Sequence, residues 1–229
     1  DCEDLSLNVS REILQHDRQV KAIRTFAIKK TLDAIDRLRK DNPDAMRTLW
    51  REFGAVLKEG LAANEEFRDR LLDLLLASTT QSNEPTSLAD YLARMADDQK
   101  HIYYLVGSSL DAVRHSPHLE TFTRKGIEIL FFTDPVDEFW LGSEVAYKDK
   151  AFLSISKGEV DLGPDQEADE GAPEKENDSA LDGLLQALRT HLQDDVKDVR
   201  VSGRLTNSPA CLVGDKDDLT PQLEQMMRQ

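Results

Sequence analysis

The chain has 229 residues, enough for one large or two modest domains that bury their cores without disulfides or metal ions. Acidic residues outnumber basic ones by 44 to 29, and the formal net charge of −15 argues against nucleic acid or an anionic membrane surface as a partner. No apolar run approaches the ~20 residues of a membrane helix, and the first residues lack a signal-peptide pattern. We therefore expect a cytoplasmic protein.

The cysteines and histidines do not predict a metal or disulfide framework. Cys2 and Cys211 lie near opposite ends of the sequence, which favours two reduced thiols. None of the five histidines stands in an H-x-x-x-H arrangement, so we expect no metal. Because the sequence opens without Met, we interpret it as a piece of a longer protein.

The first third of the chain predicts a layer of helices. Apolar residues recur at three- and four-residue steps from Val20 to Leu38, the period of one long amphipathic helix. Asn42 is placed to cap a second helix that begins at Pro43 and keeps this period up to Gly60. A third predicted helix carries the apolar residues Phe67, Leu71, Leu72, Leu74 and Leu75.

The middle of the chain alternates strand and helix. Ser87 and Asp90 form a capping-box pattern before a short helix, and the apolar run HIYYLV then predicts a strand. A helical stretch from about Ser109 to Lys125 stops at Gly126, and it is followed by a second strand, IEILFF, and by a helix opened by Asp134 and Pro135. Continuous apolar strands in this order predict a parallel β-α-β unit, buried on both faces, with a right-handed crossover.

An acidic stretch separates this unit from the end of the chain. Residues 158–178 hold nine Asp or Glu against one Lys and read as a flexible linker. Beyond it we predict a helix around Leu184, Leu188 and Leu192, strands at VKDVRVSG and PACLVG, and a last helix starting near Asp217. The fold class is thus α/β: a helical layer plus a small β-α-β sandwich in 1–157, a linker at 158–177, and a truncated second α+β domain in 178–229.

Four groups of residues are candidates for function. Gly107, Ser108 and Ser109 end the first strand, where open α/β sheets bind ligands, although a plain turn with a serine cap explains them better. Arg11 falls in a first helical turn, where its charge opposes the helix dipole. It is either a solvated arginine or a cation presented to a phosphate.

The other two groups are apolar. Phe139 and Trp140 are adjacent on a helix and point about 100° apart, so at least one of them should be partly exposed as a contact, with ordinary core packing as the alternative. The last predicted helix carries an apolar stripe that ends in two methionines, whose side chains adapt to varied partners. The members of the stripe are Leu219, Leu223, Met226 and Met227. Packing in a core or a dimer is the alternative.

Several blocks resemble one known family. The opening DLSLNVSREILQ is similar to the catalytic-loop signature of the ninety-kilodalton heat-shock (Hsp90) chaperones, in particular their bacterial branch. The same family order continues through FGAVLKEG, SLADYLARM, HIYYLVGSS, SPHLETFTRKGIEILFFTDPVDEF and VKDVRVSGRLTNSPACLV. The resemblance covers essentially all of the chain except the acidic linker, and it identifies the middle domain running into the C-terminal domain.

The resemblance implies an ATP-driven dimer that remodels partly folded client proteins. It implies that Arg11 contacts the ATP γ-phosphate, with Gln15 and Asn8 supporting that loop, while ATP and Mg²⁺ bind an N-terminal domain that this sequence lacks. It also implies client contacts at two places, the C-terminal stripe named above and the residues Asp137, Glu138, Phe139 and Trp140. The chain alone should have no cofactor and no enzyme activity, and it should be monomeric or only weakly associated.

Two departures and two alternatives accompany the resemblance. Ser6 stands where the family usually has Pro, and the bacterial tryptophan is displaced by one place to Trp140. One alternative is a purely structural spacer between ATPase and dimerisation domains. The other is an independent enzyme that binds a phosphorylated ligand near Gly107.

Overall fold

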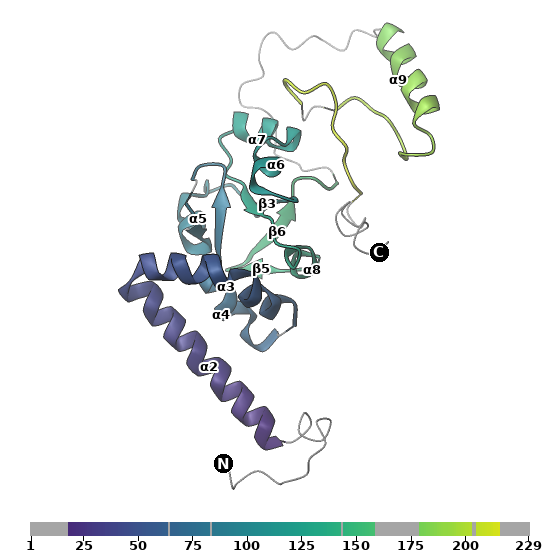
Figure 1. Ribbon diagram of the computed structural model, residues 1–229. Helices are drawn as coiled ribbons and strands as arrows, with labels where there is room; N and C mark the ends of the chain where they lie inside the picture. The colour runs from purple at the N-terminus through teal and green to yellow at the C-terminus, as the bar shows by residue number, and fades with distance from the viewer. Residues whose placement is uncertain are drawn as a thin grey trace.

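The computed structural model describes residues 18–63, 65–82, 84–142, 144–158, 179–202 and 205–215. The chain is a mixed α/β protein, as predicted, with long helices first and a sheet covered by short helices next (Figure 1). Among the described residues, no helix is long and apolar enough to span a membrane.

Two long helices open the described part of the chain. Helix α2 spans Arg18–Asp41 and α3 spans Pro43–Ala63, which confirms both predicted helices. Asn42 caps α3 as expected, because its Oδ1 accepts a hydrogen bond of 3.0 Å from the backbone N–H of Ala45. Leu32 and Ile35 of α2 are buried in the core, whereas the N-terminal half of α2 projects away from it (Figure 1).

Six strands form one sheet in the order β2-β1-β4-β3-β6-β5. The central strand β3 (His101–Val106) is parallel to β4 (Leu130–Phe132) on one side and to β6 (Lys150–Ser154) on the other. This confirms the predicted parallel β-α-β unit. Strands β1 (Leu76–Thr79) and β2 (Thr86–Ser87) extend the sheet in antiparallel fashion beyond β4, and β5 (Ala146–Tyr147) does so beyond β6.

Helices cover both faces of the sheet. Side chains of β3 and β4 alternate between two cores, one containing Ile102 and Phe132 and the other containing Tyr103 and Phe131. The first core is completed by α2, α3, α4 (Arg68–Leu74), α5 (Leu88–Arg94) and α8 (Asp137–Leu141). The second is completed by α6 (Leu110–Arg114), the 3₁₀ turn η2 (Pro117–Leu119) and α7 (Glu120–Arg124). Burial on both faces explains the unbroken apolar runs.

Three predictions in this region were incomplete. The stretch from Ser109 to Lys125 is broken into α6, η2 and α7, because Pro117 has no N–H to continue a helix. The third predicted helix ends at Leu74, one residue early, because Leu75 is extended and leads into β1. Strand β1 was not predicted. A 3₁₀ turn, η1 (Glu65–Phe67), precedes the helix. The hairpin β5-β6 was also missed; its turn places Lys148 and Asp149 at φ of 48° and 66°.

The described residues after 178 make few contacts with the sheet and its helices. Helix α9 (Ser179–His191) confirms the predicted helix, and it stands apart from the sheet in Figure 1. The strands predicted at VKDVRVSG and PACLVG are wrong within 196–202 and 209–214, where the described residues contain only one bridge, between Gly214 and Lys157. A strand needs a neighbouring strand for its hydrogen bonds, and here only that bridge supplies one. The domain boundaries at 157 and 177 stay predictions.

Candidate functional site

Helix α8 carries the predicted client-contact residues that the structure describes. It follows β4 after a turn in which the backbone N–H of Asp134 donates to Asp137 Oδ2 (3.0 Å) and the N–H of Asp137 donates to the carbonyl of Asp134 (2.9 Å). This reciprocal pair of bonds fixes the direction in which α8 leaves the sheet. The helix has only five residues, so its position depends on the contacts of its side chains.

A buried cluster of charges anchors α8 to α3. The Lys58 ammonium donates to Asp137 Oδ2 and to Asp134 Oδ2, each at 2.9 Å. The side chain of Lys58 is 6% exposed and that of Asp137 is 0% exposed, so both charges have left water. Lys58 Nζ also lies 5.3 Å from the centroid of the Phe132 ring. A buried lysine is tolerated here because carboxylates and a ring face surround it.

The second oxygen of Asp137 is used as well. Trp140 Nε1 donates to Asp137 Oδ1 at 2.8 Å, so the carboxylate links α3, the turn and α8 through both oxygens. Burial raises the pKa of Asp137, and the nearby Lys58 ammonium works against that rise. The pair is thus a structural anchor whose loss on one side leaves an uncompensated charge in the interior.

The two aromatic residues of α8 face opposite environments. Trp140 is 0% exposed and packs edge-on against Phe132 and Phe152, with ring centroids 5.3 and 5.5 Å away. Phe139 is 57% exposed. The prediction that at least one of the pair is exposed is confirmed, and the residue is Phe139. An exposed aromatic ring on a short, anchored helix is suited to contact an apolar partner.

Three of the four residues predicted to contact clients on α8 are buried. Asp137 and Trp140 are fully buried and Glu138 is 8% exposed, so none of these three offers a surface to a protein partner in this conformation. Their contribution is to hold the helix that presents Phe139. Client contact at Phe139 itself stays a prediction.

The remaining predicted site residues lie outside the described part of the chain. They are Asn8, Arg11 and Gln15 of the opening loop, and Leu219, Leu223, Met226 and Met227 of the C-terminal stripe. Their assignments stay predictions.

Gly107 and Ser109 have structural roles. Ser109 Oγ accepts a hydrogen bond of 3.2 Å from the N–H of Ala112 and caps α6. A Cβ at position 107 would lie 2.5 Å from Val113 Cγ1, so glycine is needed for α6 to pack closely on β3. Both observations favour the turn interpretation over a ligand site.

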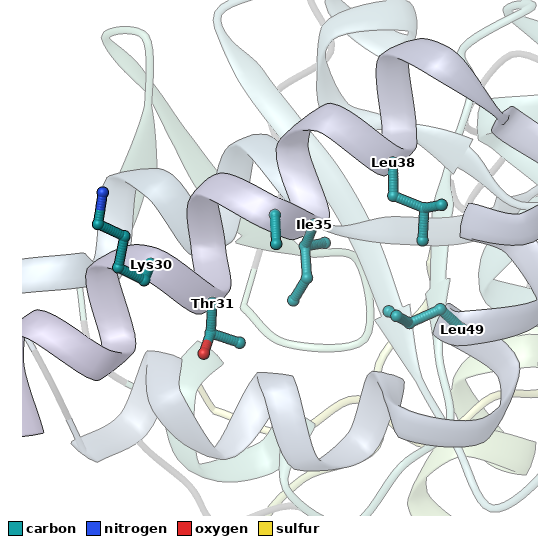
Figure 2. Close-up of a pocket in the computed structure, with 6 residues that line it drawn as sticks. Lys30, Thr31, Ile35, Leu38 and Leu49 are labelled. Carbon is teal, nitrogen blue, oxygen red and sulfur yellow. The ribbon is translucent and has the colours of Figure 1, made fainter.

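An apolar pocket of about 480 Å³ lies between α2 and α3. Figure 2 shows Ile35, Leu38 and Leu49 gathered between the two helices, with Lys30 toward one end. Its lining is mostly aliphatic and has no acid, thiol or imidazole that could activate Lys30 or Thr31. Among the residues that the structure describes, no group of three or more His, Cys, Asp or Glu side chains could hold a metal ion.

Lys58 was missed as a site residue. It occurs in the FGAVLKEG block on the buried face of α3, four residues after Gly54 and three before Leu61. A lysine at such a position signals an acidic partner in the core, and this spacing was the available clue. The identity of that partner, 76 and 79 positions away, required the structure.

Comparisons with known proteins agree with the fold and with the motifs. A family model described as "Hsp90 protein" matches residues 1–229. The proteins named "Chaperone protein HtpG" from Streptomyces coelicolor and Rhodococcus jostii are 49% and 50% identical, each over 100% of this chain and 36% of the relative. The chain thus spans about a third of the length of these curated relatives.

A solved structure gives the same result. The middle domain of a heat shock protein from Plasmodium falciparum superposes with a TM-score of 0.57 and 27% identity, over 61% of this chain and 59% of that one. The resemblance of the sequence blocks, the family model and the superposed fold all lead to one assignment. The chain belongs to the Hsp90 protein family of chaperones.

Proposed function

We propose that the chain acts within an ATP-driven chaperone and binds partly folded client proteins through the exposed face of α8. The observation that carries the proposal is Phe139, an aromatic ring that is 57% exposed on a helix anchored by a buried ion pair. A ring held in this way gives contact area to apolar segments at little entropic cost. The C-terminal stripe of Leu219, Leu223, Met226 and Met227 would supply a second client surface.

The second part of the proposal concerns ATP. Arg11 would contact the γ-phosphate of ATP held with Mg²⁺ by an N-terminal domain, with Gln15 and Asn8 supporting the loop. The full-length protein would work in the cytoplasm as a homodimer. In that protein, Arg11→Ala should lower ATP turnover and leave nucleotide affinity nearly unchanged, because pocket and arginine belong to different domains. Unchanged turnover would contradict this role.

The client site can be tested by aggregation of a heat-labile protein followed by light scattering. The parent chain should suppress scattering, and Phe139→Ser should suppress it less. Only Phe139 should be changed, since truncating the fully buried Trp140 would cost about 3 to 5 kcal/mol of stability and confuse the result. The expected loss for one exposed aromatic contact is a several-fold rise in the concentration needed.

The control is a second phenylalanine of nearly equal exposure. Phe53 on α3 is 59% exposed, so Phe53→Ser removes the same kind of side chain from another surface. Suppression should be weakened by Phe139→Ser and unaffected by Phe53→Ser. Equal weakening by both variants would mean a general effect of hydrophobicity, and no effect of Phe139→Ser would favour the spacer interpretation.

A further inference from the structure

Glu120, the first residue of α7, holds a segment that lies far away in the sequence. Its carboxylate accepts hydrogen bonds from the backbone N–H groups of Thr206, Asn207 and Ser208, of which the last two measure 2.8 and 3.0 Å. It also accepts from the hydroxyl groups of Thr206 and Ser208. The partners are separated from Glu120 by 86 to 88 positions, so the arrangement joins two distant parts of the chain.

Both carboxylate oxygens are saturated. Oε2 receives the N–H and hydroxyl of Thr206 and the N–H of Asn207, while Oε1 receives the N–H and hydroxyl of Ser208. Three successive N–H groups converging on one acceptor form the concave arrangement with which a backbone binds anions. Hydrogen bonds to an ionised acceptor are about twice as strong as neutral ones.

The same segment contacts the α/β unit at a second place, just after the end of β6. Gly158 N–H donates to the carbonyl of Gly214 at 2.9 Å, and Gly214 N–H donates to the carbonyl of Ser156 at 3.2 Å. This parallel bridge continues from the end of β6, and the Glu120 contact is made at α7. Residues 205–215 therefore have two separate contacts with the α/β unit, one at Glu120 and one at the bridge.

We propose that Glu120 is a latch that fixes residues 205–215 against the α/β unit and so sets the orientation between that unit and the chain that follows it. Opening the latch leaves the bridge at Gly214 as the remaining anchor, about which the segment turns. In a chaperone that changes shape, this is a place where orientation is held or released. The proposal does not depend on client binding at Phe139.

The chemistry requires a carboxylate at position 120. Glutamine keeps the length of the side chain but replaces one acceptor oxygen with an NH₂ group, which meets N–H donors instead of accepting from them. The hydrogen bond from Ser208, followed by those from Asn207 and Thr206, lowers the pKa of Glu120 to about 2. A lowered pKa means that the stabilisation is complete above the ordinary glutamate range and is lost as the pH falls toward 2. The latch is therefore closed at neutral pH.

Hydrogen exchange of the chain measured by mass spectrometry tests the latch. In Glu120→Ala, the amides of residues 206–208 should exchange about tenfold faster, since each loses its acceptor. In Glu120→Gln, the amides that face the new NH₂ group should exchange faster, while one oxygen still accepts. Glu144→Gln is the matched control, because Glu144 is an exposed glutamate for which the described residues give no hydrogen bond. Amides of β3 and β4 should exchange as in the parent. Unchanged exchange at 206–208, or equal loosening of β3 and β4, would overturn the proposal.

A distance measurement tests the orientation itself. Spin labels at Leu212→Cys and Asp98→Cys, in a background with both native cysteines replaced by serine, use one exposed position on each side of the latch. The distribution between the labels should be narrow with Glu120 and broad with Glu120→Ala. Equally narrow distributions would show that the bridge at Gly214 suffices and would remove the latch role.

Discussion

Helices α3 and α9 have similar sequence patterns but different surroundings. Both place apolar residues at three- and four-residue steps, yet α3 buries Met46 and Leu61 at 2% and 1% exposure, whereas α9 leaves Leu184 and Leu188 at 55% and 37%. Helix α3 packs against α2, α4 and α8, and within the described residues nothing comparable covers α9. Periodicity therefore predicts a helix and its apolar face, but it does not say what covers that face.

The largest expected effect comes from removing the buried charge of Lys58 on α3. Lys58→Met leaves Asp137 unpaired in the interior and should lower the free energy of unfolding by about 3 to 5 kcal/mol, measured by urea denaturation. The double variant Lys58→Met, Asp137→Asn removes both charges and should recover part of that loss. Lys21→Met, at an exposed position of α2, should change stability by less than about 0.5 kcal/mol. Equal effects of the two lysine substitutions would contradict the anchor.

The second test compares two leucines directly. Leu130 in β4 is 0% exposed, so Leu130→Ala should cost about 2 to 5 kcal/mol through lost burial and the cavity left behind. Leu184→Ala in α9 should change stability by no more than about 0.5 kcal/mol, since the side chain is already in water. Denaturation midpoints of the two variants give the comparison. A large cost at Leu184 would mean that another surface covers α9 in solution.

The third test uses alkaline pH, because two buried tyrosines, Tyr91 of α5 and Tyr104 of β3, should resist ionisation. Burial raises the pKa of Tyr91 and Tyr104 from the ordinary value near 10 to about 12. The folded state therefore holds these protons more tightly than the unfolded state, so stability is complete below pH 10 and falls as the pH rises toward 12. A rise of about two units corresponds to roughly 2 to 3 kcal/mol for each tyrosine.

A conservative variant isolates one of the two tyrosines. Tyr104→Phe keeps the ring that contacts Phe132 and Phe152 but removes the ionising hydroxyl. Denaturation curves between pH 9 and pH 12 should then show a smaller loss of stability than the parent. The same loss in both proteins would mean that other groups cause the alkaline transition.

The sequence predicts local structure better than long-range contacts. The helices α2 and α3, the strands β3 and β4 and the caps at Asn42 and Ser109 follow from periodicity and capping chemistry, which involve near neighbours. Strands β1, β5 and β6 were not predicted, and the strands predicted near the C-terminus lack neighbouring strands. Strand formation depends on a partner that local sequence does not name.

The candidate site shows the same limit. The FW pair on α8 predicts that one ring is exposed, because the two positions diverge by about 100°. Which ring is buried depends on the contacts of Trp140 with Phe132, Phe152 and the Asp137 carboxylate, which come from two strands and a buried ion pair. The contact of Glu120 with residues 206–208 likewise joins segments that no local pattern connects.

The smallest expected effect concerns a cap that lies inside the covered region. Ser87 Oγ accepts from the N–H of Asp90 at 3.1 Å and closes the first turn of α5, so Ser87→Ala should cost about 1 kcal/mol. Ser87→Thr keeps a hydroxyl that can accept from the N–H of Asp90 and donate to Asp90 Oδ2, so it should recover part of that loss. Thermal denaturation followed by circular dichroism would measure both variants. A loss well above 2 kcal/mol for Ser87→Ala would mean that its hydrogen bond to Asp90 Oδ2 also holds β2 to α5, and that the covered region depends on this junction as well as on its apolar core.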